Sequence, residues 1–295
     1  MKKVLVIVGP TASGKSDLAV YLAKKLKGEV ISADSRQVYK GLNIGTGKIT
    51  KKEMCGIPHY LLDVANPKKS FDASQYKALA EKAIEKIESK NKLPIVVGGT
   101  GFYIDTLMGK INLPEVPPNK TLRKKLEKYS AEKLYSMLDK KDSRRAKEID
   151  PRNKVRVIRA LEIIEKLGKV PIVQPATSTR HKFIFIGLNP NQKNLEKRIY
   201  ARILKRLDAM IREARHLRRG TLSIKRMEAL GLEYRYLARL LQKKITKQEF
   251  IEQLFSEIKK YSKRQNTWFK RNKKIKWFNP KDYKGIENWT RGVLG

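Results

Sequence analysis

The sequence predicts an α/β protein whose core is a parallel sheet with helices on both faces, and it predicts a helical domain inserted into that core. Two observations support this prediction. Short apolar runs alternate with segments of helical periodicity in the first 110 residues, and one more apolar run follows near residue 181. The charged stretch between these parts has no strand signals and is bounded by proline-containing breaks.

The apolar runs are short enough to be buried strands rather than membrane spans. The expected strands are Val4–Val8, Glu29–Ser32, Tyr60–Val64, Pro94–Val97 and His181–Leu188. Helices are expected at residues 16–26 and 74–88, because apolar residues recur there at helical spacing. From Leu195 onward the chain has helical character throughout.

Two breaks set the expected domain boundaries. "LPEVPPN" (Leu113–Asn119) and "GKVPIVQPATSTR" (Gly168–Arg180) flank the charged helical stretch. We therefore expect a discontinuous core of residues 1–113 and 178–295, with a helical C-terminal part, and a helical insertion domain of residues 114–177. Cys55 is the only cysteine, so an internal disulfide is excluded and a cytoplasmic location is expected.

Positive charge dominates the composition. The chain has 67 Lys and Arg residues against 29 Asp and Glu, a formal net charge of +38. Residues 1–110 hold 19 basic and 10 acidic residues, whereas the remaining 185 hold 48 and 19. A lysine-rich genome would spread the excess evenly, so the uneven distribution favours a polyanionic partner, with nucleic acid the leading candidate.

The motif "GPTASGKS" predicts a phosphate-binding loop between an expected strand and an expected helix, which is the context that this motif requires. Its backbone N–H groups and the positive end of the helix would surround an anion. Lys15 would reach the outer phosphates, and the Ser16 hydroxyl would bind Mg²⁺. The loop by itself does not identify the phosphate compound. The predicted phosphate-binding residues are Gly9, Pro10, Thr11, Ala12, Ser13, Gly14, Lys15 and Ser16.

Two further motifs follow expected strands. In "ISADSRQVY", three roles are open for Asp34: a Mg²⁺ ligand through water, a helix cap, or a catalytic base that faces the phosphate site. In "VVGGTGFY", glycines and Thr100 stand where a P-loop ATPase usually has an acid. The missing acid argues against an ATP-hydrolysing motor, although a tight strand-to-helix turn would also explain the glycines.

The segment "IKKYSKRQNTWFKRNKKIK" (Ile258–Lys276) is strongly basic and has no acidic residue. Aromatic and apolar side chains from Phe250 to Trp268 follow one helical stripe, which favours core packing over base stacking. The basic residues around this stripe would then face outward, where they can meet RNA phosphates.

These motifs together resemble the tRNA dimethylallyltransferases, also called tRNA isopentenyltransferases or IPP transferases. The resemblance covers nearly the whole chain. It rests on segments that occur in this order in the family: GPTASGKS, DSRQVYKGLNIGTGK, GIPHYLLDV, VVGGTGFYI and RQNTW. It implies a P-loop, kinase-like α/β core with a helical insertion domain.

The resemblance also implies an activity. Family members transfer a dimethylallyl group from dimethylallyl diphosphate to N6 of adenosine 37, 3′ to the anticodon, in tRNAs that read codons beginning with U. The partners implied are a tRNA anticodon stem-loop, the prenyl diphosphate and Mg²⁺, and we expect a monomer without membrane association. The loop at residues 9–16 would hold the donor diphosphate, Asp34 would be the base that takes the N6 proton, and Thr100 would support it.

Other roles are implied residue by residue. A diphosphate-binding arginine is assigned to Arg206, with Arg202 as the alternative register, and the catalytic set becomes Asp34, Thr100, Lys15 and Arg206. The resemblance assigns tRNA contacts to Asp34, Ser35, Arg36, Gln37, Thr100, Arg123, Val155, Arg156, Val157, Ile158, Arg159, Lys263, Arg264, Gln265 and Trp268. The stretch "ALGLEYRYL" departs from the GYKE-like family motif, so contacts there are not transferred.

Two other hypotheses compete with this one. A nucleotide or small-molecule kinase would explain the phosphate loop, but not the charge of the later part or the glycines before Thr100. An RNA-binding P-loop protein without prenyl chemistry would explain the charge, but it leaves Asp34 and Thr100 without a role.

Overall fold

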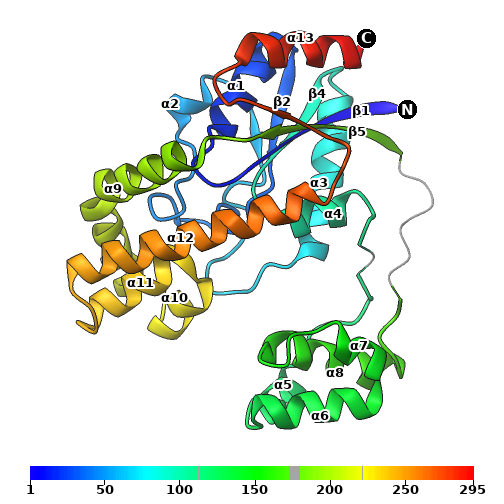
Figure 1. Ribbon diagram of the computed structural model, residues 1–295, viewed down its shortest axis with the longest axis vertical. Coiled ribbons are helices and arrows are strands. Elements are labelled where there is room, and N and C mark those ends of the chain that lie inside the picture. Colours follow the sequence, from blue (N-terminus) through cyan, green and yellow to red (C-terminus); the bar gives the residue numbers. More distant parts are fainter. Residues whose placement is uncertain (112, 173–179, 221) are drawn as a thin grey trace. The chain divides into compact units, whose positions relative to one another are not determined.

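The computed structural model describes residues 1–111, 113–172, 180–220 and 222–295. The chain forms two compact units, residues 1–109 with 177–295 and residues 110–176, which are described separately below (Figure 1). In the described ranges, no helix combines the length and the apolar character that crossing a membrane would require.

The larger unit is built on a six-stranded parallel sheet. Its strands are β1 (Lys2–Val8), β2 (Gly28–Ser32), β3 (His59–Tyr60), β4 (Leu93–Val97), β5 (His181–Leu188) and β6 (Ile275–Phe278). They lie in the order β3-β2-β4-β1-β5-β6, with Leu5 opposite both Ile95 and Ile184. Because all strands are parallel, the loops after β1, β2 and β4 meet at one edge, where ligands bind in such sheets.

Helices cover both faces of this sheet, so residues 4–8 of β1 are buried on either side. The covering helices are α1 (Lys15–Lys25), α13 (Tyr283–Leu294), α3 (Ala73–Glu88) and α4 (Gly101–Leu107), with the short α2 (Lys51–Met54) near the edge. α1 and α13 share an apolar cluster with one face, to which Leu5, Ile7 and Val30 contribute. α3 begins with a capping box of Asp72 and Gln75 and packs against β2 and β4 from the other face.

A second apolar cluster joins the C-terminal helices to the loop after β2. These helices are α9 (Gln192–Gly220), α10 (Ile224–Leu230), α11 (Leu232–Leu241) and α12 (Lys247–Lys270). Val38 and Leu42 from the loop pack with Ile203, Tyr234 and Phe250 from the helices. Both α9 and α12 thereby lie beside the loops that follow the strands.

The structure confirms the expected α/β class and the strand at His181–Leu188, but it corrects two expectations. The strand expected at Tyr60–Val64 is limited to His59–Tyr60, because Leu61 and Asp63 have φ angles of 62° and 56°, which an extended strand does not allow. The expectation that the chain is helical throughout from Leu195 onward is wrong, because β6 pairs with β5 from Ile275 to Phe278. Lysines flank Ile275, so the sequence around β6 has no apolar run that would predict a strand.

The smaller unit is helical. It contains α5 (Lys120–Leu126), α6 (Ala131–Lys141), α7 (Ser143–Lys147) and α8 (Lys154–Leu167), with an apolar cluster of its own. Glu162 of α8 is buried and accepts hydrogen bonds from the backbone N–H of Asn119 (2.8 Å) and from Nε and Nη2 of Arg123 (2.7 and 2.6 Å). Arg159 adds a third charged contact at 3.3 Å. One carboxylate thus joins α8 to the start of α5.

We predict that Glu162→Ala destabilises the protein by about 2–3 kcal/mol, because two arginines lose their buried partner and are only partly exposed to solvent. Chemical denaturation followed by circular dichroism measures this change. Glu165→Ala, an exposed carboxylate on the same helix, is the matched control and should shift stability by less than about 0.5 kcal/mol.

The loss of stability caused by Glu162→Ala should depend on pH. Burial alone raises the pKa of Glu162, but the hydrogen bonds from Arg123 and Asn119 outweigh it and lower the pKa below its usual 4.5. The stabilisation is therefore present above pH 4.5 and is lost as the pH falls below that value. An unchanged stability difference between wild type and Glu162→Ala at low pH would contradict this assignment.

Candidate functional site

A cavity of about 710 Å³ lies at the carboxyl edge of the sheet in the larger unit. Residues 11–16 of the phosphate-binding motif line it, together with Asp34 and Gln37 after β2 and Gly98 and Gly99 after β4. Arg198, Arg202 and Arg206 of α9 line it from the helical side, and Tyr261 and Gln265 from α12. The three motifs that the sequence places after separate strands therefore meet in one cavity.

The backbone of the phosphate-binding loop has the turns that its glycines permit. Gly14 has a φ angle of 91° and immediately precedes α1, so the chain reverses there and the first turn of the helix faces the cavity. Ala12 also has a positive φ angle, of 60°. Gly9 lies so close to Leu188 of β5 that a side chain would meet its carbonyl oxygen. The loop therefore keeps a compact path from β1 to α1, as the motif predicts.

Lys15 begins α1 inside this cavity. Its Nζ donates to the carbonyl of Pro10 at 2.5 Å and lies 3.5 Å from Oγ of Ser13. Burial lowers the pKa of Lys15 to about 7; the nearby Asp34 raises it in part, and the positive charge of Arg202 lowers it further. The cavity of the free protein thus favours loss of the Lys15 proton more than water does, and an anion in the cavity would favour the charged form.

Asp34 follows β2 and turns the chain back on itself. Its Oδ1 accepts hydrogen bonds from the backbone N–H groups of Arg36 (2.8 Å) and Gln37 (3.3 Å). Oγ1 of Thr100 accepts the N–H of Ser35 at 3.0 Å. Thr100 therefore holds the residue next to Asp34, so the two motifs support each other directly.

The arginines of α9 occur at intervals of four residues and share one face of the helix. Nη2 of Arg202 donates to Oγ1 of Thr11 at 3.0 Å, and burial lowers the pKa of Arg202. Arg206 lies against Gly47, where an added side chain would collide with its guanidinium group. Arg206 and Arg202, the two candidates for the diphosphate-binding arginine, both line the cavity, so each is placed to contact an anion there.

Gln265, which the resemblance assigns to tRNA contact, is buried where α12 lines the cavity. It is 6% exposed, its Oε1 accepts the N–H of Thr11 at 2.8 Å, and its Nε2 donates to the carbonyl of Gly99 at 2.9 Å. One side chain thus joins the phosphate-binding loop to the turn after β4. The amide group of Gln265 lies directly beside Gly99, and a side chain at position 99 would collide with it.

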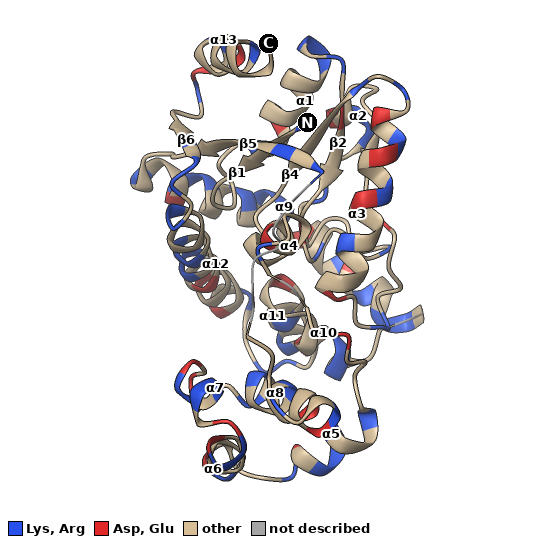
Figure 2. Ribbon diagram, turned by 90° about the vertical axis from the view of Figure 1, so that its right-hand side faces the viewer, with Lys and Arg blue, Asp and Glu red and all other residues tan. Residues whose placement is uncertain are grey.

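The rest of this segment divides between interior and surface. Trp268 lies over Gly101, and its Nε1 donates to Oδ2 of Asp105 at 2.8 Å. Lys263 and Arg264 are exposed, and Arg264 forms an ion pair with Glu257 at 3.0 Å. Lys and Arg residues recur along the ribbon of α12 (Figure 2). This helix therefore has exposed basic residues such as Lys263, while its uncharged Gln265 bonds to the cavity loops.

In the smaller unit, the predicted RNA-contacting residues differ in exposure. Val155 is 79% exposed and Arg156 is exposed, whereas Val157 and Ile158 are in the apolar cluster at 0% and 6%. Those two side chains are not at the surface, because α8 has an apolar face that packs against α5 and α6. Arg123 and Arg159 are half-buried partners of Glu162.

The donor set for a metal ion is small. Ser16 lies in the first turn of α1 and lines the cavity, as the motif predicts. No group of three or more His, Cys, Asp or Glu side chains is placed to hold a metal among the residues that the structure describes. This set suits Mg²⁺, which keeps several waters and takes few protein ligands when a substrate supplies phosphate oxygens.

Some cavity residues have no counterpart in the sequence-based predictions. Tyr261 belongs to the stripe from Phe250 to Trp268, for which the sequence predicts core packing. Arg198 could have been found from the sequence, because arginines recur there every four residues. Lys281 and Tyr283 follow β6, so they could not be placed without that strand.

Comparisons with known proteins agree with this geometry. The family model described as IPP transferase matches residues 37–272. A tRNA dimethylallyltransferase from Thermoanaerobacter sp. (strain X514) is 39% identical over 99% of this chain and 96% of the relative. Another from Anoxybacillus flavithermus (strain DSM 21510 / WK1) is also 39% identical, over 99% of this chain and 95% of the relative.

Solved structures are similar over the whole chain. A full-length tRNA isopentenylpyrophosphate transferase from Bacillus halodurans matches with a TM-score of 0.75 at 35% identity, covering 100% of this chain and 97% of the other. A eukaryotic dimethylallyltransferase acting on tRNA matches with a TM-score of 0.82 at 27% identity, covering 99% and 78%. The named relatives are prenyl-transferring enzymes, so the kinase hypothesis loses its support, and this chain belongs to the IPP transferase family.

Proposed function

We propose that this chain transfers a dimethylallyl group from dimethylallyl diphosphate to N6 of adenosine 37 in tRNAs that read codons beginning with U. The observation that carries this proposal is that a phosphate-binding loop, an aspartate and an arginine face line one cavity in a member of this family. The cavity then holds the diphosphate beside the base that accepts the prenyl group.

The positive groups are proposed to act on the leaving group. As the C1–O bond of the allylic donor breaks, negative charge collects on the diphosphate. Lys15 and the arginines at positions 202 and 206 would stabilise that charge where it develops, which is the electrostatic effect that contributes most in many enzymes. The backbone amides of residues 14–16 would add hydrogen bonds at the positive end of α1.

Asp34 is proposed to take the proton. The new bond forms between C1 of the donor and N6 of the adenine, and the N6 proton passes to Asp34 as the diphosphate leaves. We assign the proton to Oδ2, because Oδ1 already accepts two backbone N–H groups. Removing the proton helps because the N6 lone pair is delocalised into the ring and is a weak nucleophile.

Mg²⁺ is proposed as the cofactor, held by the Ser16 hydroxyl and by oxygens of the donor. When bound, it would neutralise part of the negative charge of the diphosphate. The basic side chains of α12 and of the smaller unit are proposed to hold the RNA backbone. Adenosine 37 then has to leave the anticodon stack to reach the cavity.

The first test is direct transfer. We expect labelled dimethylallyl to pass from its diphosphate to an unmodified tRNA with adenosine at position 37, and not to the same tRNA with guanosine there. Thin-layer analysis of digested nucleosides measures the product. Binding of the tRNA without any transfer of label would overturn the proposal.

Asp34→Asn should lower the rate of transfer by about 10²–10⁴-fold while the affinity for tRNA changes little. Asparagine can keep a carbonyl oxygen at the position of Oδ1, so the turn at Arg36 and Gln37 is retained while the base is lost. Asp208→Asn, which changes an exposed carboxylate of α9 outside the cavity lining, is the matched control and should retain most activity. An active Asp34→Asn enzyme would exclude Asp34 as the base.

The lowered pKa of Lys15 predicts a pH-dependent affinity for the donor. Binding the anion draws a proton onto Lys15, so affinity should fall as the pH rises above about 7, by up to about tenfold per pH unit. Calorimetry with a non-reactive dimethylallyl diphosphate analogue from pH 7 to 9 measures this. Lys15→Met should remove the extra pH dependence, whereas the exposed control Lys24→Met should keep it.

A further inference from the structure

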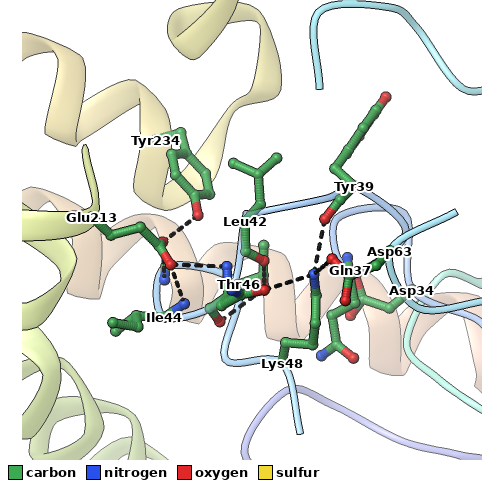
Figure 3. Close-up of polar contacts among 12 residues, drawn as sticks. Asp34, Gln37, Tyr39, Leu42, Ile44, Thr46, Lys48, Asp63, Glu213 and Tyr234 are labelled. Atoms are coloured by element: carbon green, nitrogen blue, oxygen red, sulfur yellow. Dashed lines mark hydrogen bonds and ion pairs between the residues drawn. The ribbon is translucent and has the colours of Figure 1, made fainter. Parts of the chain in front are cut away.

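Glu213 has an unusual set of partners for a side chain that no motif identifies. It lies on α9, about two turns beyond Arg206. Its Oε2 accepts the backbone N–H groups of Asn43 (3.0 Å) and Ile44 (2.8 Å). Its Oε1 accepts the N–H of Gly45 (3.0 Å) and the hydroxyl of Tyr234 (2.6 Å), as Figure 3 shows for the labelled residues. One carboxylate therefore receives four hydrogen bonds.

These bonds hold a segment that has no helix or strand of its own. The backbone between Gly41 and Thr50 is irregular, so its amides need acceptors from elsewhere. A charged acceptor makes such bonds shorter and stronger than a neutral one. Burial raises the pKa of Tyr234, so its hydroxyl stays protonated and acts as a donor. Tyr234 lies on α11, so Glu213 joins α9, α11 and this segment.

The far side of the segment has a separate anchor. Lys48 is 8% exposed, and its Nζ donates to the carbonyl of Tyr39 (2.8 Å), to Oδ1 of Asn43 (3.0 Å) and to Oδ1 of Asp63 (2.6 Å). Figure 3 shows the Lys48 contacts to Tyr39 and Asp63 opposite those of Glu213. The residues between the two anchors thus have little freedom to move.

The segment held in this way forms part of the cavity wall. Thr46 and Gly47 line the cavity, and a Cβ added at Gly47 would meet the Arg206 guanidinium group, which would have to shift. Glu213 and Arg206 are on the same helix, so the carboxylate sets where the helix and the segment meet. A displacement of residues 43–45 would move Gly47 and free the Arg206 guanidinium group.

We propose that Glu213 is a positioning residue for the donor site, acting through the Asn43–Gly47 segment on the placement of Arg206. This inference rests on the proposed function, because it takes the cavity to be the diphosphate site. Glu213 itself does not line the cavity, so its effect reaches the substrate only through this wall.

Glu213→Gln tests the proposal with almost no change in size. Its amide has one accepting oxygen, so in either orientation two of the four donors face an NH₂ group. We expect the KM for dimethylallyl diphosphate to rise by about tenfold or more, since small misplacements of binding groups have effects of this size or larger. The Kd for tRNA should stay within about twofold.

Two variants control for general effects. Tyr234→Phe removes one donor and leaves the three backbone bonds, so its KM for the donor should stay within about threefold of wild type. Asp208→Asn neutralises an exposed carboxylate of the same helix and should have no effect. If Glu213→Gln lowers the melting temperature but the folded protein keeps the wild-type KM for the donor, Glu213 is only structural and the proposal fails.

A measurement on the wild-type protein covers the case in which Glu213→Gln does not fold. Inorganic diphosphate should slow hydrogen exchange in peptides that contain residues 43–47 as well as in those that contain residues 11–16. Slowing confined to residues 11–16 would overturn the proposal. Failure of the transfer reaction in wild-type protein tests the proposed function separately, because the exchange experiment does not require transfer.

Discussion

The cavity depends on one buried amide. Gln265 binds the N–H of Thr11 and the carbonyl of Gly99, so the loops after β1 and β4 cannot move independently. Both loops leave the same edge of the sheet, but parallel pairing fixes only where each strand ends. The side chain from α12 sets the distance between the loops themselves. An unpaired N–H or C=O at this depth would cost about 1–3 kcal/mol, which makes any other arrangement unfavourable.

Charge in the cavity follows a second constraint. Lys15 and the arginines of α9 line the cavity together with the carboxylates of Asp17, Asp34 and Glu53. Burial lowers the pKa of Lys15 to about 7 although Asp34 raises it in part, and the positive charge of Arg202 lowers it further. Like charges held together destabilise the free protein and become favourable when an anion arrives. An anion of the kind proposed above would therefore relieve this repulsion when it enters the cavity.

The helical unit has an apolar cluster and buried ion pairs of its own. Its apolar cluster is formed by residues of this unit, and Glu162 forms ion pairs with Arg123 and Arg159 of the same unit. Other basic side chains of this unit, such as Arg156, are exposed to solvent and are not needed for this internal ion pairing. α12 makes the same division within one helix, where Gln265 and Trp268 face the cavity loops and Lys263 faces solvent.

The sequence alone determined the features that local patterns specify: the strands at Val4–Val8 and His181–Leu188, the glycine loop that joins a strand to a helix at residues 9–16, and the α/β class. Short apolar runs and a glycine motif act over a few residues, so they can be recognised without the fold. Tertiary structure decided the rest. β6 exists because β5 offers an edge, Gln265 is interior because Thr11 and Gly99 approach it, and Val157 and Ile158 are buried by neighbouring helices. The role proposed for Glu213 depends on three backbone amides that are far from it in the sequence and close to it only in the fold, so no local sequence pattern could predict it.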